Sequence, residues 1–340
     1  MKAAQLVETG KDLEIRDLSA PRVGKNDVLV KVKAAGICKS DVHYKSGAAP
    51  VGKLPITLGH EVSGIVEELG EGCCKLKKRD RVCVHYLVTC GDCYFCNTGN
   101  EQFCKRGRMI GKHMDGGFAD YISVPERNLF SLPSELSFGE GAVMMCSSAT
   151  AFHAMRKAGD MVGKSVAIFG MGGLGASAVQ LAQIFGARTV YAVDIDESKL
   201  ELAKGYEAIP INAKKENPVK KIRELTGGGA GVSFEFVGNP LTVKQAVSCL
   251  GVQGKMIQVG ICNRDVSLNP YNDLLLKEGE IIGCADHLRQ ELPILIKLAQ
   301  DGKLDLSKII TDRIRFREIN EGMKRLETNE GSPIRIVVEM

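Results

Sequence analysis

The chain has 340 residues, 44% hydrophobic and 25% charged, an ordinary globular composition in a chain longer than one hydrophobic core usually serves. Lys and Arg number 45 against 41 Asp and Glu, and the formal charge of +4 is spread along the chain, which argues against nucleic acid and anionic membranes as partners. No segment has the pattern of a signal peptide or the roughly 18 apolar residues of a membrane span. We therefore expect a cytoplasmic protein of two domains.

The first 135 residues or so predict a β-rich structure. Apolar, β-branched runs occur at residues 28–32, 64–67 and 80–84, separated by Gly and Pro and with little helical periodicity. From about Gly163 the pattern changes to repeated units of short apolar strand, Gly turn and amphipathic helix. The strands of these units are predicted at 165–169, 189–193, 232–236 and 255–259.

Strands that alternate with helices indicate a parallel, doubly wound sheet, so this half is predicted to have an α/β fold. The alternation ends after residues 281–283, where a helix at 290–300 and a terminal strand at 335–338 follow. That last strand could rejoin the first half. We therefore expect a split domain, residues 1–147 and 285–340, into which a second domain, residues 148–284, is inserted.

Twelve cysteines in a chain of this length favour reduced thiols over a disulfide scaffold. Four of them lie close together with Gly and Asn where the chain must turn, and they are Cys90, Cys93, Cys96 and Cys104. Four such thiolates can close a tetrahedron around a structural zinc ion at about 2.3 Å per bond. Buried free cysteines and an iron–sulfur cluster are the alternatives, although the spacing does not match the bacterial ferredoxin pattern.

A glycine-rich turn follows the predicted strand at 165–169 and opens a helix at 176–185. Its residues are Gly170, Met171, Gly172, Gly173, Leu174 and Gly175. Such a turn lets the backbone approach a pyrophosphate at the helix N-terminus, and Asp194, at the end of the next strand, can accept from ribose hydroxyls. Asp194 would repel a 2′-phosphate, and Lys199, the nearest base, lies a helical turn further on. We therefore predict that the glycine turn, which includes Leu174, binds a dinucleotide cofactor together with Asp194 and Lys199. The charge of Asp194 favours NAD over NADP.

A third group is dispersed along the chain. Cys38, His60 and Cys146 could hold a zinc ion with its fourth position open, and such an ion polarises a bound oxygen. Spacing alone leaves another interpretation at least as strong, in which both cysteines are small buried hydrophobic residues and His60 is a hydrogen-bonded core histidine.

These features are ordered as in one known family, which the chain resembles over essentially its whole length: the zinc-dependent medium-chain alcohol dehydrogenases of the microbial type. The matching segments are GICKSDVH at 36–43, GHE at 59–61, the four-cysteine segment 90–104, DGGFA at 115–119, the glycine turn with its acid, and IRIV at 334–337. The resemblance implies a GroES-like catalytic domain with an inserted Rossmann domain, and an active site in the cleft between them.

By the resemblance, Cys38, His60 and Cys146 are ligands of the catalytic zinc, and Glu61 is a nearby carboxylate that can enter the coordination sphere. Asp41 would orient His60. Ser40 and His43 match the family's proton relay, in which the histidine releases the proton near the surface.

Lys39 and Arg335 match positions that neutralise the cofactor pyrophosphate; the alternative is that they are simply exposed cations. Tyr86 falls where the family places a large pocket residue. Lys112 and His113 fall near another pocket wall, where a cation could meet an acidic substrate, although solvent exposure is the stronger interpretation.

We thus expect an enzyme with two Zn²⁺ ions per chain that uses NAD to interconvert an alcohol and its aldehyde or ketone, assembled as a homotetramer or homodimer. Polyol-oxidising relatives commonly carry Glu-Pro where this chain has Met145 and Cys146, which favours the alcohol dehydrogenase type. A polyol, sugar or threonine dehydrogenase of the same fold is the second hypothesis. A zinc- and dinucleotide-binding protein without turnover is the third.

Overall fold

The computed structural model describes all residues from Met1 to Met340. Its contacts divide the chain into two compact units: residues 1–149, 288–302 and 310–340 form the first, and residues 150–287 and 303–309 form the second. The insertion expected at 148–284 therefore runs to residue 287. Residues 303–309, expected in the first domain, lie with the second unit, because Gln180 and the backbone of Asp305 exchange two hydrogen bonds.

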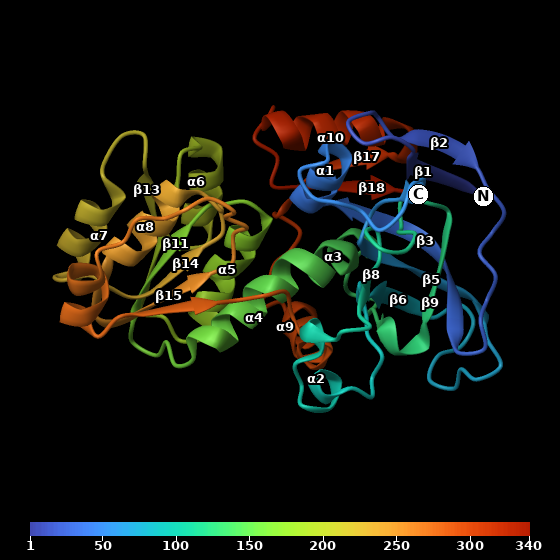
Figure 1. Cartoon of the computed structure of the whole chain (residues 1–340), viewed down its shortest axis with the longest axis horizontal. Helices are drawn as coiled ribbons and strands as arrows, with labels where there is room; N and C mark the ends of the chain where they lie inside the picture. The colour runs from blue at the N-terminus through green and yellow to red at the C-terminus, as the bar shows by residue number, and fades with distance from the viewer. The chain divides into compact units, whose positions relative to one another are not determined.

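The first unit is mainly β-structure (Figure 1). Its seven-stranded sheet has the order β10-β6-β5-β3-β18-β17, with β9 paired beside β3. The strands of this sheet are β3 (Asp27–Ile37), β5 (Glu61–Leu69), β6 (Arg81–Val84), β9 (Tyr121–Pro125), β10 (Leu129–Ser131), β17 (Ile310–Arg315) and β18 (Arg335–Glu339). Because β18 pairs antiparallel with β3, the terminal strand does rejoin the first half of the chain.

Two smaller sheets and five helices complete the first unit. The smaller strands are β1 (Lys2–Leu6), β2 (Glu14–Asp17) and β4 (Ile56–Thr57) in one sheet, and β7 (Leu87–Val88) and β8 (Arg108–Met109) in the other. The helices are α1 (Lys39–Ser46), α2 (Tyr94–Asn97), α3 (Phe138–Val143), α9 (Leu292–Gln300) and α10 (Ile319–Thr328). The helix expected at 290–300 thus begins as a 3₁₀ turn, Arg289–Glu291, because Pro293 belongs to the first turn of α9.

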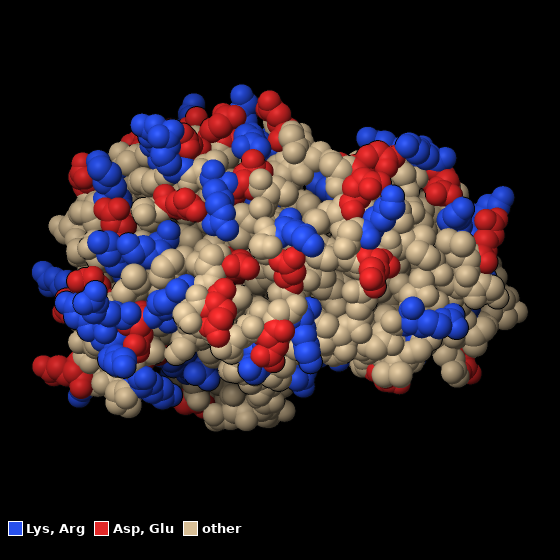
Figure 2. All heavy atoms as spheres, turned by 180° about the vertical axis from the view of Figure 1, so that it is seen from behind, with Lys and Arg blue, Asp and Glu red and all other residues tan.

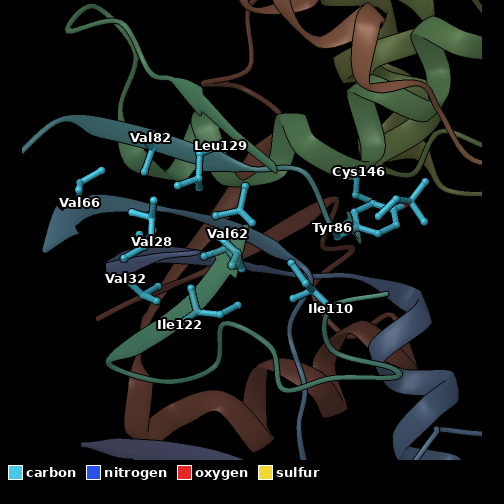
Figure 3. Close-up of a cluster of buried hydrophobic side chains, with 14 of the residues drawn as sticks. Val28, Val32, Val62, Val66, Val82, Tyr86, Ile110, Ile122, Leu129 and Cys146 are labelled. Atoms are coloured by element: carbon cyan, nitrogen blue, oxygen red, sulfur yellow. The ribbon is translucent and has the colours of Figure 1, made fainter. Parts of the chain in front are cut away.

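The core of the first unit positions the site. Alternating residues of β3, β5, β6 and β9 point inward and pack as one cluster of buried valines, leucines and isoleucines. Figure 3 shows Tyr86 and Cys146 at one end of this cluster, away from Val66 and Val82. The apolar cluster therefore extends to Tyr86 and Cys146, two of the residues predicted for the active site.

The second unit is a parallel six-stranded sheet with the order β13-β12-β11-β14-β15-β16. Its strands are β11 (Ser165–Phe169), β12 (Thr189–Asp194), β13 (Ile209–Asn212), β14 (Ala230–Glu235), β15 (Leu250–Gln258) and β16 (Glu280–Gly283). Counted within the unit, this is the order 3-2-1-4-5-6 of dinucleotide-binding sheets, which reverses between β11 and β14. The predicted doubly wound sheet is confirmed, and β13, which the sequence pattern did not single out, is one of its two edge strands.

Helices cover both faces of this sheet. They are α4 (Ala149–Ala158), which begins at the boundary of the two units, α5 (Gly173–Ile184), α6 (Glu197–Gly205), α7 (Pro218–Thr226) and α8 (Pro240–Ser248). Helices α7 and α8 pack on the face that carries Phe169, Tyr191 and Val193, and α5 and α6 contact β11, β12 and β13. The predicted start of α5 at residue 176 is three residues late, because Gly172 caps the helix and its first turn belongs to the glycine motif.

No helix of the protein combines the length and the apolar character needed to cross a bilayer. Figure 2 shows acidic and basic side chains interspersed on one face, so the basic residues there do not form a single stripe.

Gly59 directly precedes His60, a predicted site residue, and only glycine fits easily at this position. Its φ of +92° is left-handed, and a Cβ there would lie 2.6 Å from the ring of Phe118, a fully buried residue. We predict that Gly59→Ala destabilises the first unit by about 2–4 kcal/mol, from backbone strain plus overpacking. Chemical denaturation measures the loss. Gly10 has a similar φ, +84°, but open space around it, so Gly10→Ala should cost only about 1 kcal/mol. Equal losses in the two variants would show that the contact with Phe118 adds nothing.

Candidate active site and metal centres

Cys38, His60, Glu61 and Cys146 meet at one point of the first unit. Cys38 follows β3 and caps the N-terminus of α1, and Glu61 begins β5, with His60 immediately before it. Because β3 and β5 are antiparallel with Gly36 opposite Glu61, the end of one strand lies beside the start of the other. Cys146 comes from a π-helical turn, Met144–Ser148, of the kind often found at functional sites.

The donor atoms of these four residues suit a metal ion. They lie within 4.8 Å of one another, and all four residues are buried. The sulfur atoms of Cys38 and Cys146 are 4.0 Å apart, too far for a disulfide and close to the edge of about 3.8 Å of a tetrahedron with 2.3 Å zinc–sulfur bonds. The four residues therefore form a candidate metal site, and their assignment as zinc ligands remains a prediction.

Asp41 organises this cluster. Its fully buried carboxylate accepts from the backbone N–H of Cys38 at 2.9 Å and of Gly59 at 3.3 Å, and its Oδ1 lies 3.2 Å from Nδ1 of His60. With Nδ1–H donating to Asp41, the lone pair of Nε2 is left for a metal. The orienting role expected for Asp41 matches this geometry.

Glu61 and Arg335 form a buried ion pair beside the cluster. Arg335 Nη1 lies 3.0 Å from Glu61 Oε1, and the two residues are 3% and 0% exposed. Burial raises the pKa of Glu61 to about 8, although the Arg335 guanidinium opposes the shift. The alternative that Arg335 is an exposed cation is wrong, because β18 carries it into the sheet. Its contact with a cofactor pyrophosphate remains a prediction.

Lys39, Ser40 and His43 lie on α1. The Ser40 hydroxyl is 3.8 Å from the sulfur of Cys38, and His43 follows one turn later on the same side of the helix, half-buried. Lys39 is exposed, and its ammonium donates to the carbonyls of Leu326 and Glu327 at the end of α10. Lys39 thus stabilises a helix C-terminus here, while its predicted role toward the pyrophosphate is untested.

The predicted pocket residues differ in their surroundings. The buried ring of Tyr86 packs edge-on against His60, with centroids 5.1 Å apart. Lys112 is half-buried with its ammonium 5.7 Å from the centre of the Tyr44 ring. His113 accepts from the backbone N–H of Met109 at 2.9 Å, and burial lowers its pKa. A neutral His113 does not favour an acidic substrate.

The four cysteines of segment 90–104 form a second cluster. Sulfur–sulfur distances are 3.4 Å for Cys90–Cys104, 3.6 Å for Cys93–Cys96, and 3.8 Å for Cys90–Cys96 and Cys93–Cys104. These lengths fit the edges of a zinc tetrahedron, about 3.8 Å, and leave no open face. The donor set and its spacing therefore suit a structural zinc ion.

Glu101, inside this segment, was missed by the sequence reasoning. Its carboxylate accepts from the hydroxyl of Thr89 at 3.2 Å and from the backbone N–H of Arg289 at 2.8 Å, and it lies 3.5 Å from a guanidinium nitrogen of Arg127. Glu101 therefore fastens the cysteine segment to the start of α9. Its only signal in the sequence was an acidic residue among turn-forming neighbours.

The glycine turn of the second unit has the geometry of a phosphate-binding turn. Gly170 has φ +94°, and a Cβ on Gly175 would lie 1.9 Å from the carbonyl oxygen of Gly170, so only glycine permits this approach of α5 to β11. Asp194 accepts from the backbone N–H of Met171 at 2.6 Å. Asp194 therefore contacts the glycine turn, and its predicted bond to a ribose hydroxyl is untested, whereas Lys199 lies in the first turn of α6, half-buried.

Comparisons with known proteins agree with both units. Residues 24–134 match the alcohol dehydrogenase GroES-like domain, and residues 173–301 match the zinc-binding dehydrogenase domain. The chain is 36% identical to an alcohol dehydrogenase of Geobacillus stearothermophilus and 34% identical to an NAD-dependent alcohol dehydrogenase of Sulfurisphaera tokodaii, in both cases over 96% of each chain. A solved alcohol dehydrogenase from Aeropyrum pernix superposes with a TM-score of 0.91 at 35% identity, covering 100% of both chains.

Relatives of this identity over nearly the full length identify the reaction class as well as the fold. Together with two family domains in the expected order, they show that the chain belongs to the zinc-dependent medium-chain alcohol dehydrogenase family.

Proposed function

We propose that this NAD-dependent alcohol dehydrogenase holds its catalytic zinc with Cys38, His60 and Cys146 and a structural zinc with the four cysteines of segment 90–104. The convergence of two thiols, an imidazole and a carboxylate within 4.8 Å in a buried site carries the proposal. When bound, zinc supplies a Lewis acid for the substrate oxygen and NAD accepts the hydride. The two thiolates offset the charge of the ion, so the site is a moderate Lewis acid.

The chain's own residues prepare the site for this reaction. Asp41 fixes the tautomer and the direction of His60, and the ring of Tyr86 packs edge-on against that imidazole. Ser40 begins a proton path beside Cys38, and His43 ends it one turn along α1. Arg335 holds Glu61 beside the ligands, which keeps a carboxylate within reach of the metal.

A single substrate experiment separates the remaining hypotheses. NADH production should be assayed with primary, secondary and cyclic alcohols, polyols and threonine. We expect simple alcohols to give the highest kcat/KM, because Met145 and Cys146 stand where polyol-oxidising relatives commonly carry Glu-Pro. A preference for polyols or threonine would support the second hypothesis, and no turnover of any substrate would support the binding protein.

The same proposal includes a cytoplasmic location, which suits six thiols kept reduced at two metal sites.

The proposal also includes assembly as a homodimer or homotetramer. The edge strand β16 is exposed on both faces, and Leu275 and Leu276 beside it are 68% and 58% exposed. An unpaired apolar edge of this kind is typically covered by another chain.

The first prediction from this assignment concerns metal content. Because both donor sets are complete, the purified protein should contain about two zinc ions per chain by elemental analysis. Cys146→Ala should lose one ion and the activity while remaining folded. Cys93→Ala should lose the other ion together with stability or soluble yield. Iron in place of zinc, or one ion per wild-type chain, would contradict the assignment.

The second prediction concerns the cofactor. Asp194 touches the glycine turn, where its charge accepts from a ribose hydroxyl and repels a 2′-phosphate. Steady-state kcat/KM should favour NAD over NADP by roughly a hundredfold, on the order of 3 kcal/mol. Asp194→Gly should narrow this ratio. Equal efficiency with the two cofactors in the wild-type protein would show that Asp194 does not select between them.

The third prediction concerns the proton path. His43→Ala should lower alcohol oxidation by roughly ten- to a hundredfold at neutral pH, with partial recovery on adding a small soluble base. Ser40→Ala should be worse and resist rescue, because it removes the group nearest the ligands. Turnover is measured against pH and buffer concentration where an isotope effect shows that hydride transfer limits the rate. If His43 only packs beside the cofactor, His43→Ala will weaken NAD binding and leave the pH profile unchanged.

A further inference from the structure

Resting on the proposed NAD-dependent function, we propose that Glu235 is a positioning residue for the nicotinamide half of the cofactor. Glu235 is the last residue of β14 and is 0% exposed. Its carboxylate joins the loop that follows β14 to the end of β15.

One carboxylate oxygen organises the β14–α8 loop. Oε1 of Glu235 accepts from the backbone N–H groups of Val237 and Gly238, both at 2.9 Å, and from the hydroxyl of Thr242 at 2.7 Å. Thr242 lies in the first turn of α8. The charge therefore holds the loop and the following helix in one arrangement.

The other oxygen reaches the neighbouring strand. Oε2 accepts from the side-chain amide of Gln258 at 2.9 Å and from Gly238 N–H at 3.1 Å, and Gln258 is the last residue of β15, directly opposite Glu235 in the sheet. The backbone carbonyl of Glu235 accepts from Val259 and Gly260. Glu235 thus bonds both segments that leave this edge of the sheet.

The two loops also touch each other, so movement of one would displace the other. A Cβ on Gly238, where φ is +76°, would lie 2.4 Å from the carbonyl oxygen of Ile261. A Cβ on Gly260 would lie 2.6 Å from Oε2 of Glu235 itself. The carboxylate sits at the centre of a contact that only small residues permit.

The position of these loops in the sheet indicates which part of the cofactor they serve. A dinucleotide binds outside the carboxyl ends of the strands, across the point where the strand order reverses, with one mononucleotide on each half. The glycine turn and Asp194 lie on the β11–β12 half. The loops held by Glu235 lie on the β14–β15 half, which leaves them the nicotinamide nucleotide.

A carboxylate is required here because every group that contacts it donates. The donors are two backbone amides, a hydroxyl and a side-chain amide, all of them neutral. A glutamine at 235 would turn its own NH₂ group toward some of these donors, and a buried donor without an acceptor is unfavourable. Glu235→Gln should therefore loosen the loops while nearly preserving the shape of the side chain.

The test compares NADH with ADP-ribose, which lacks only the nicotinamide ring. The chain has no Trp to report binding by fluorescence, so calorimetry is used on the full-length zinc-loaded protein. Glu235→Gln should raise the dissociation constant of NADH roughly tenfold and leave that of ADP-ribose within about twofold. Asp194→Gly should weaken both ligands. Equal changes for the two ligands in Glu235→Gln, or no change in either, would overturn the proposal.

Ser233→Ala is the matched control. Ser233 lies on the same strand and the same face, and its hydroxyl donates to the carbonyl of Ala246 in the same helix, at 2.7 Å. Its loss should lower the unfolding midpoint without changing the ratio of the two dissociation constants. A changed ratio in Ser233→Ala would show that general loosening, not the Glu235 contacts, controls nicotinamide binding.

A second variant keeps the proposal testable if Glu235→Gln does not fold. Thr242→Val removes one donor and should shift the NADH to ADP-ribose ratio in the same direction by a smaller factor, whereas Thr242→Ser, which keeps the hydroxyl, should restore it. An unchanged ratio in Thr242→Val would count against the role of Glu235. If wild-type protein binds neither NADH nor ADP-ribose, the proposed NAD-dependent function fails instead.

Discussion

The candidate metal cluster depends on the pairing of β3 with β5 and on the buried carboxylate of Asp41 in the first turn of α1. Asp41 accepts from the backbone of Cys38, from the backbone of Gly59 and from the imidazole of His60, so one buried charge fixes three parts of the site. Burial of a carboxylate is unfavourable unless its oxygens accept hydrogen bonds. The same bonds that stabilise Asp41 therefore fix the positions of Cys38 and His60, two of the proposed metal ligands.

Charge compensation explains why so many ionisable groups can be buried together. In the proposed catalytic site two thiolates would offset a divalent ion, and Arg335 pairs with Glu61 beside them. Isolated charges of this kind would be very costly in a dry interior, and removing one partner of a buried pair is strongly destabilising. The charged groups of the site therefore stabilise one another, and each of them depends on the opposite charges beside it.

In both units buried carboxylates accept hydrogen bonds from neighbouring segments and hold them in place, but the parts that they hold differ. Asp41 holds His60 in the candidate metal site, Glu101 fastens the cysteine segment to α9, and Glu235 joins two loops at the carboxyl end of the parallel sheet. In each case the acceptor receives backbone N–H groups that a loop would otherwise leave unpaired. Buried acidic residues in the first turn of a helix or at the end of a strand therefore fix the loops around these sites.

The sequence by itself determined the features that are local along the chain. The four cysteines of segment 90–104 and the glycine turn lie within short stretches, and the turns that these stretches must make bring their functional atoms together. The alternation of strands and helices likewise predicted the parallel sheet, because its period is a property of neighbouring residues. Domain order and reaction class followed once these motifs were placed in a family.

Only the tertiary structure decided the contacts between distant segments. Sequence spacing could not show that Cys38, His60 and Cys146 lie close together; the meeting of β3, β5 and a π-helical turn brings them to one point. Arg335 was expected as a cation near the cofactor, yet strand pairing buries it against Glu61. Whether a charged residue is exposed or buried depends on partners supplied from elsewhere in the chain, and a single sequence carries no local signal for such partners.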